Sequence, residues 1–191
     1  MASAELIVDL AVRGNRIVVK AGDAFRSRFL AEDFFVDYGA DVPLSTLGES
    51  TLAVPFVLNV APLVWRSGRR YRIPLLDSAL AAALQDVRRA FRATYPDVSW
   101  DGELDADRTV DLGALGGSPA IALLFSGGVD SVHSALSRRG LMKHLITVES
   151  LLGHWDRQGK GGRAAAREHF RGCAAALGCE CHFITSNLRV F

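Results

Sequence analysis

The segment 121–131 constrains the fold of this chain more than any other part of the sequence. It reads IALLFSGGVDS, in which an apolar run typical of a strand stops at a serine and two glycines, and a helical pattern starts near Asp130. A strand, a glycine turn and a helix bring backbone N–H groups together at the positive end of the helix, where anions bind. Because Gly127 and Gly128 let the main chain approach a bulky phosphate, we expect this turn to bind a nucleotide.

The turn fits neither of two common glycine-rich phosphate motifs. The Walker-type loop requires a lysine that does not follow Gly128, and the dinucleotide motif requires G-x-G-x-x-G where this chain has S-G-G-V-D-S. Asp130 would repel a polyphosphate unless a cation lay between them, and Mg²⁺ commonly bridges a carboxylate and phosphate oxygens. The alternative, that Asp130 only caps the helix, leaves the paired glycines and the serines Ser126 and Ser131 without a role. The residue set therefore favours a metal-bound polyphosphate.

In these residues the chain resembles the PP-loop ATP pyrophosphatases, whose signature after an apolar strand is S-G-G-x-D-S. Members of this superfamily include GMP synthetase, asparagine synthetase, argininosuccinate synthetase, NAD synthetase and 7-cyano-7-deazaguanine synthase. The resemblance covers about residues 118–189 and implies a Rossmann-like α/β/α domain with a parallel sheet. It also implies that ATP is cleaved between its α- and β-phosphates, that AMP is transferred to an acceptor, and that pyrophosphate leaves.

The same resemblance implies ATP and Mg²⁺ as cofactors and a role for each residue of the turn. The nucleotide would be held by Ser126, Gly127, Gly128, Val129, Asp130 and Ser131, with Asp130 binding the metal and with Ser126 and Asp130 acting in catalysis. Val148 and Glu149 would lie near the adenine. The expected activity is that of an AMP-forming ligase or amidotransferase acting on an unknown acceptor, with tRNA among the candidates. Two alternatives stay open: a module that binds ATP or AMP without chemistry, and a regulatory remnant whose first domain binds a partner.

Composition excludes several other classes of protein. The net charge of +1 does not favour a nucleic-acid or membrane surface. No run of 18 apolar residues is present, and the first residues lack a secretory signal, so we expect no membrane partner. The 3 cysteines are an odd number and all lie late in the chain, which favours reduced thiols and a cytoplasmic location.

Residues 1–96 are expected to form a small α+β domain of unknown role. Strand candidates lie at 6–12, 16–20 and 34–38. The apolar stretch 52–65 carries two prolines, and edge strand, extended core segment and short helix all stay open for it. A helix is expected from Asp77 or Ser78 to the residue before Pro96, because Leu80, Leu84, Val87 and Phe91 recur at helical spacing.

The rest of the chain is expected to hold a linker at 97–117 and the nucleotide-binding domain at 118–191. Strands are expected at 120–125, 145–149 and 181–185, and helices at about 130–139 and 163–177. Only three strands follow Pro119, whereas sheets of this class commonly have about five. We therefore expect the chain to be the N-terminal portion of a longer domain, with an exposed sheet edge that favours a homodimer.

Two weaker candidate sites lie in this second part. In the loop 150–162, Trp155 is a candidate for contact with a base, and Arg157, Lys160 or Arg163 for contact with phosphate; an ordinary surface loop is the alternative. A zinc site could be drawn from His169, Cys173, Cys179, Cys181 and His182. Because no C-x₂-C spacing is present, we favour small core cysteines over a zinc site.

Overall fold

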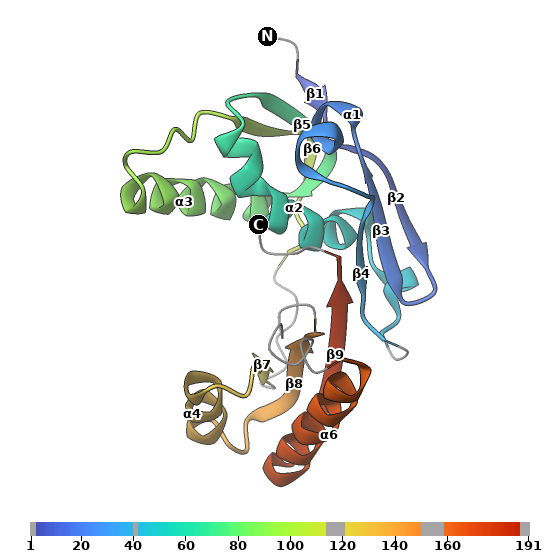
Figure 1. The fold of residues 1–191 in the computed structure, drawn as a ribbon. Helices are drawn as coiled ribbons and strands as arrows, with labels where there is room; N and C mark the ends of the chain where they lie inside the picture. Colours follow the sequence, from blue (N-terminus) through green and yellow to red (C-terminus); the bar gives the residue numbers. More distant parts are fainter. Residues whose placement is uncertain (1–2, 40–41, 114–120, 150–158, 188–191) are drawn as a thin grey trace. The chain divides into compact units, whose positions relative to one another are not determined.

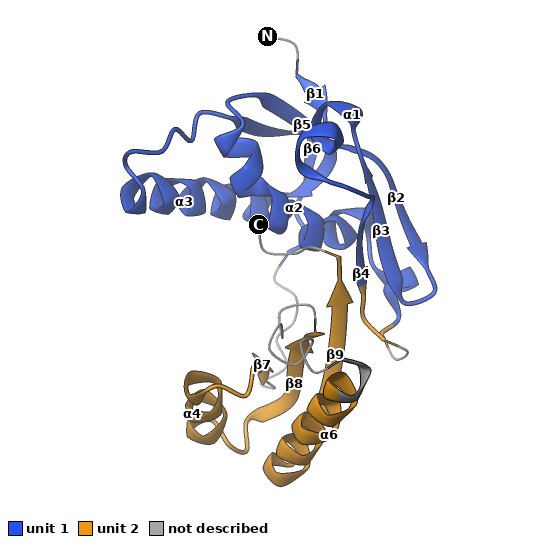
Figure 2. Ribbon diagram, viewed as in Figure 1, with its two compact units in different colours: residues 1–36, 43–115 blue, residues 37–42, 116–191 orange. Residues whose placement is uncertain are grey.

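The computed structural model describes residues 3–39, 42–113, 121–149 and 159–187, and it has a mixed α/β fold (Figure 1). The chain divides into two compact units, of which unit 1 comprises residues 1–36 and 43–115 and unit 2 comprises residues 37–42 and 116–191 (Figure 2). None of the described helices is long and apolar enough to cross a membrane.

Unit 1 combines a parallel sheet with an antiparallel hairpin. The parallel sheet has the order β1-β5-β6, built from β1 (Ala4–Glu5), β5 (Arg70–Asp77) and β6 (Glu103–Val110). The expected hairpin is present as β2 (Ile7–Arg13) and β3 (Arg16–Ala21), joined through Gly14 at φ +61°. The remaining elements are α1 (Asp23–Phe29), β4 (Phe34–Asp37), the 3₁₀ helix η1 (Leu44–Thr46), α2 (Glu49–Arg66) and α3 (Ser78–Thr94).

The stretch 52–65 lies within helix α2, whereas the sequence left edge strand, extended core segment and short helix open for it. It runs for 18 residues and contains both Pro55 and Pro62. An internal proline removes a helical hydrogen bond and costs about 3 kcal/mol, so local preference opposes this helix. Burial favours it, because α2 buries a large apolar surface formed by Leu52, Ala53, Phe56, Val57, Val60, Ala61, Val64 and Trp65. Tertiary packing therefore decides the conformation of this segment.

Helix α3 begins where the sequence predicted it. Asp77 is the N-cap residue, and its Oδ1 accepts a hydrogen bond of 2.9 Å from the N–H of Leu80. On its far side, Arg88 donates to the carbonyl oxygen of Trp100 from Nε at 3.0 Å and from Nη2 at 2.7 Å. Arg88 thus satisfies a backbone acceptor of its own unit.

The assignment of 97–117 to a linker is corrected by strand β6. This strand lies within the stretch and pairs in parallel with β5 from Glu103 opposite Arg70 to Val110 opposite Asp77. Its start is fixed by Gly102, whose N–H donates to the carbonyl of Trp65 at 2.8 Å. A Cβ atom at Gly102 would lie 1.9 Å from the carbonyl oxygen of Val64, so only glycine allows this close approach. The sequence predicted a linker here because four of the eight residues of β6 are charged, which lowers the hydrophobic signal of a strand.

Unit 2 has the predicted alternation of strands and helices. Its elements are β7 (Ile121–Leu124), α4 (Val129–Ser137), β8 (Met142–Val148), α6 (Gly159–Leu177) and β9 (Glu180–Ser186). The three strands are parallel, with β8 between β7 and β9. The buried core of this unit comprises Phe125, Ala135, Met142, Leu145, Ala166, Phe170 and Ala174. The turn 126–128 therefore lies between the carboxyl end of β7 and the amino end of α4.

Candidate functional site

The residue before the glycine turn is anchored to two neighbouring elements. The N–H of Phe125 donates to the carbonyl of Ile146 at 2.8 Å, and the hydroxyl of Thr147 donates to the carbonyl of Phe125 at 2.9 Å. Thr147 is fully buried, and this hydrogen bond satisfies its hydroxyl, which water cannot reach. The ring of Phe125 packs edge-on against Phe170 of α6, with the ring centroids 5.8 Å apart. Phe125, from which the turn starts, is therefore held by both β8 and α6.

Gly127 is required by the fold itself. Its φ angle is +74°, a conformation that strains residues with a side chain. A Cβ atom there would also lie 2.9 Å from a ring carbon of Phe170. Two independent constraints thus demand glycine at this position whether or not a ligand binds.

Gly128 has no such structural requirement. Its φ of −76° and ψ of 165° are open to any residue, and a Cβ atom would meet only the hydroxyl oxygen of Ser126, at 3.5 Å. The fold therefore leaves a glycine unexplained at the one position where the chain enters helix α4. A ligand that approaches the main chain closely would require this glycine.

The amino end of α4 presents backbone donors that lack a cap. The first hydrogen bond of the helix runs from the N–H of Val132 to the carbonyl of Gly128 at 3.0 Å, so the N–H groups of Val129, Asp130 and Ser131 precede it. No side chain of the described residues caps this end. Unpaired main-chain donors at the positive end of a helix dipole are the kind of group that binds anions such as phosphate.

The side chains of the turn add hydroxyl groups and one carboxylate. The hydroxyl of Ser131 donates to the carbonyl of Gly128 at 2.9 Å, and the hydroxyl oxygens of Ser126 and Ser131 lie 3.4 Å apart. Asp130 is exposed and forms no ion pair with any residue that the structure describes. The structure therefore brings all six predicted site residues to one exposed turn, with the carboxylate available to a cation.

Glu149, expected near the adenine, is held by an ion pair. Nε of Arg167 lies 2.5 Å from Oε1 of Glu149, and Nη2 donates to Oε2 at 2.7 Å. The Glu149 side chain is only 10% exposed, and this pairing raises the pKa of Arg167. The guanidinium also lies 5.3 Å from the ring centroid of Phe183 on β9. The pair thus links the carboxyl end of β8 to α6.

The candidate residues of the loop 150–162 and of its surroundings lie mostly outside the described residues. Trp155 and Arg157 lie outside the described residues, as does the side chain of Lys160. Arg163 is exposed on α6.

Among the described residues, no cysteine belongs to a group of three or more side chains placed to hold a metal ion. Cys173, Cys179 and Cys181 all pack against the core of unit 2. Burial raises the pKa of the Cys181 thiol, partly offset by Arg171, so a thiolate is disfavoured there. Among the residues that the structure describes, the group that could hold a metal is a different one: His144, Glu180 and His182. No spacing in the sequence indicates this group, because its members come together only through the pairing of β8 with β9.

Two surface depressions lie in unit 1 and include no residue of the turn. One, of about 240 Å³, is lined by Gly68, Arg69, Arg70, Asp101 and Glu103. The other, of about 160 Å³, is lined by Trp65, Leu76, Ala81, Leu84, Gln85, Leu104, Asp105, Ala106 and Thr109. Neither gathers the uncapped amides and glycines that distinguish the turn after β7.

Comparison with protein-family models, curated proteins and solved structures gave no match for this chain. The case for a function therefore depends on the geometry of the turn and on its six-residue signature.

Proposed function

We propose that the turn 126–131 binds the triphosphate of ATP together with Mg²⁺. The observation that carries this proposal is the amino end of α4, where three uncapped N–H groups follow a glycine that the fold does not need. The donor set fits the ligand, because main-chain amides and hydroxyls suit phosphate oxygens and a carboxylate suits a hard cation.

Each residue of the turn has a role that follows from its position. The N–H groups of Val129, Asp130 and Ser131 would bind phosphate oxygens, and Gly128 would let the phosphate approach the main chain. The hydroxyls of Ser126 and Ser131 would add two further donors on the same side of the turn. Asp130 would hold Mg²⁺, which neutralises charge on the phosphates when it is bound. Gly127 and Phe170 would keep this arrangement rigid before the ligand arrives.

The reaction that this site would support is attack on the α-phosphate with pyrophosphate as leaving group. Such a transfer needs positioning and charge neutralisation more than covalent help from the protein. Within the proposal, β7, α4, β8, α6 and β9 form the first part of a Rossmann-like domain, in which ligands bind beyond the carboxyl ends of parallel strands. The protein would then be an AMP-forming ligase or amidotransferase of the PP-loop type, with an acceptor that we leave unassigned.

Calorimetric titration with ATP in the presence and absence of Mg²⁺ tests the binding step. We expect Asp130→Asn to weaken Mg²⁺-dependent ATP binding at least about tenfold, because the carboxylate that shares the metal is gone. Glu168→Gln is the matched control, since Glu168 is an exposed acidic residue of the same unit. Failure of the wild-type chain to bind ATP with Mg²⁺, or equal affinities in wild type and Asp130→Asn, would overturn the assignment.

Product analysis tests the class of reaction. After incubation of the full chain with ATP, Mg²⁺ and candidate acceptors, AMP and pyrophosphate are the expected products. Formation of ADP would contradict the proposed chemistry even if binding were confirmed. Binding without turnover across a broad set of acceptors would favour a nucleotide-binding module.

A further inference from the structure

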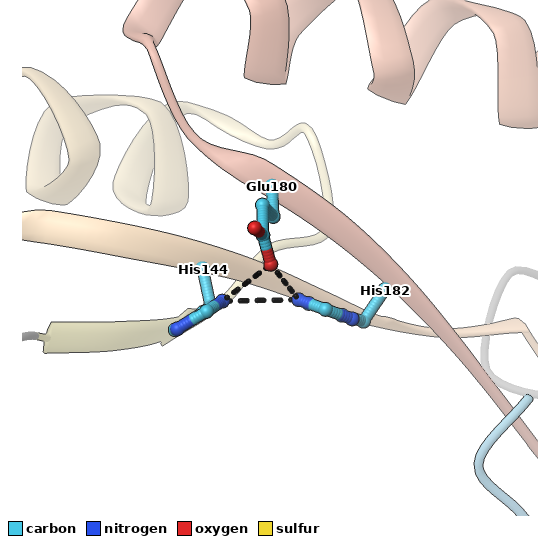
Figure 3. Close-up of side chains that lie close together, drawn as sticks. All are labelled: His144, Glu180 and His182. Carbon is cyan, nitrogen blue, oxygen red and sulfur yellow. Dashed lines mark hydrogen bonds and ion pairs between the residues drawn. The ribbon is translucent and has the colours of Figure 1, made fainter. Parts of the chain in front are cut away.

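We propose that His144, Glu180 and His182 form a binding site for a divalent transition metal ion, with Zn²⁺ as the best fit. The three side chains converge at one point of unit 2 (Figure 3), and their candidate ligand atoms all lie within 4.8 Å of one another. This site is separate from the turn 126–131 and does not depend on the proposed nucleotide binding.

The pairing of two strands brings the three residues together. His144 lies on β8 opposite Glu180 on β9, and His182 lies two residues further along β9, opposite Ile146. Side chains alternate between the two faces of a sheet, and Leu145 and Cys181 point into the core of unit 2. His144, Glu180 and His182 therefore share the opposite face of the sheet.

The distances among the ligand atoms match those around a tetrahedral ion. Nδ1 of His144 lies 3.0 Å from Nε2 of His182, and Oε2 of Glu180 lies 3.3 Å from the first nitrogen and 3.5 Å from the second. Bonds of about 2.0–2.1 Å at tetrahedral angles place neighbouring ligand atoms about 3.3–3.4 Å apart. The observed triangle can thus hold an ion with only small shifts of the side chains.

Protons alone satisfy this triangle poorly. With both imidazoles neutral, one N–H placed between the two ring nitrogens satisfies that pair, but neither nitrogen then has a hydrogen left to donate to the carboxylate oxygen of Glu180. A metal ion accepts electron pairs from all three atoms at once. The arrangement is therefore better explained by a shared cation than by a hydrogen-bonded histidine pair.

The ligand types select the class of metal. Two imidazoles and one carboxylate suit Zn²⁺ and its neighbours in the first transition row, whereas Mg²⁺ and Ca²⁺ prefer oxygen ligands only. The side chains of His144, Glu180 and His182 are 42%, 72% and 32% exposed, so water has access to complete the coordination. Three protein ligands plus one water is the pattern of an open zinc site.

The position of the site in the sheet separates it from the nucleotide turn. His144 and Glu180 lie near the beginning of β8 and β9, whereas the turn 126–128 follows the end of β7. Because the three strands are parallel, the metal group lies toward the amino ends of the strands and the turn lies at their carboxyl ends. A metal here would tie β8 to β9 and stabilise unit 2 without contacting the proposed ATP site.

Titration of the chelator-treated full chain with ZnCl₂ in a calorimeter tests the proposal. We expect one zinc ion to bind the wild-type chain, and His144→Ala, His182→Ala and Glu180→Gln each to weaken binding at least about tenfold. His133→Ala and His169→Ala are the controls, because these histidines lie on helices α4 and α6 and should leave the affinity unchanged. Absence of zinc binding in the wild type, or unchanged affinity in both His144→Ala and His182→Ala, would overturn the site.

Two further measurements guard against loss of affinity through misfolding and against a second site. Circular dichroism should show the same secondary structure in Glu180→Gln as in the wild type, since the Glu180 side chain is largely exposed. X-ray absorption of the zinc-loaded chain should show nitrogen and oxygen ligands without sulfur. A sulfur ligand would instead indicate binding at His169 and Cys173, whose Nε2 and Sγ lie 3.8 Å apart, and would contradict the proposal.

Discussion

At the scale of single residues, Gly127 and Gly128 meet different demands although they are neighbours in the chain. Gly127 is needed for its positive φ and for the space that Phe170 occupies. Gly128 has an ordinary backbone conformation and room for a Cβ atom, which would lie at normal contact distance from the Ser126 hydroxyl oxygen. The sequence predicted a paired-glycine turn, but only the structure separates the glycine that the fold requires from the glycine that a ligand would require.

This difference gives a paired prediction about stability and binding. Gly127→Ala should lower the free energy of unfolding by about 1–2 kcal/mol, the usual cost of a left-handed conformation in a residue with a side chain. Gly128→Ala should leave stability within about 0.5 kcal/mol of the wild type, as for a surface substitution without steric conflict. It should nevertheless weaken ATP binding, because the added methyl group faces the phosphate. Urea unfolding and calorimetry measure the two effects.

Two outcomes would contradict the role that we assign to Gly128. If Gly128→Ala unfolds as readily as Gly127→Ala, its glycine serves the fold and not a ligand. If Gly128→Ala binds ATP as the wild type does, the main chain at this position does not approach a phosphate.

At the scale of elements, helix ends and buried faces decide which segments become helices. Asp77 caps α3 as its sequence predicted, and its Oδ2 also accepts from the N–H of Leu112, at 3.3 Å, just beyond β6. Helix α2 forms in spite of Pro55 and Pro62 because so much of its surface is buried. Caps are local and readable from sequence, whereas the burial that overrides proline is not.

The cap at Asp77 predicts a pH-dependent contribution to stability. The N–H of Leu80 is the main cause that lowers the pKa of Asp77 in the folded chain. Since the folded pKa is below the unfolded one, the charged cap stabilises the fold above the unfolded pKa, and this contribution disappears as the pH falls through the folded pKa. We therefore expect Asp77→Ala to lower the melting temperature at pH 7, and the difference from the wild type to shrink below about pH 4.

Asp77→Asn provides the control for this prediction. An asparagine can still accept the N–H of Leu80 but carries no charge, so the difference in melting temperature between Asp77→Asn and Asp77→Ala should vary little across the same pH range. A difference between Asp77→Ala and the wild type that stays constant from pH 7 to strongly acidic conditions would contradict the role of the charged cap.

At the scale of the whole molecule, the chain consists of two compact units, and the candidate sites all lie in unit 2. The turn 126–131 and the group His144, Glu180 and His182 belong to the same run of three parallel strands, β7, β8 and β9. Unit 1 has its own parallel sheet and two surface depressions but no comparable turn among its described residues. If the chain binds ATP, we therefore expect the nucleotide to bind unit 2 and to protect that unit from exchange.

Hydrogen exchange measured by mass spectrometry tests this expectation on the intact chain. Saturating ATP with Mg²⁺ should slow exchange in peptides that cover β7 and the amino end of α4, because the ligand engages the N–H groups of 129–131. At a ligand concentration ten times the dissociation constant, binding adds about 1.4 kcal/mol to the free energy of unfolding of the bound region. Peptides from α2 and α3 should exchange at unchanged rates. Protection confined to unit 1 would place the nucleotide elsewhere.

The sequence by itself determined the strand, turn and helix around Ser126–Ser131, the cap at Asp77 and the alternation of elements in unit 2. These features depend on hydrophobic periodicity, glycine and capping chemistry, all of which act between residues close together in the chain. The tertiary structure decided that α2 is a helix, that β6 is a strand, and that His144 meets Glu180 and His182. These outcomes depend on burial and on the register between distant strands, because their free energy comes from contacts that form only when the whole unit packs.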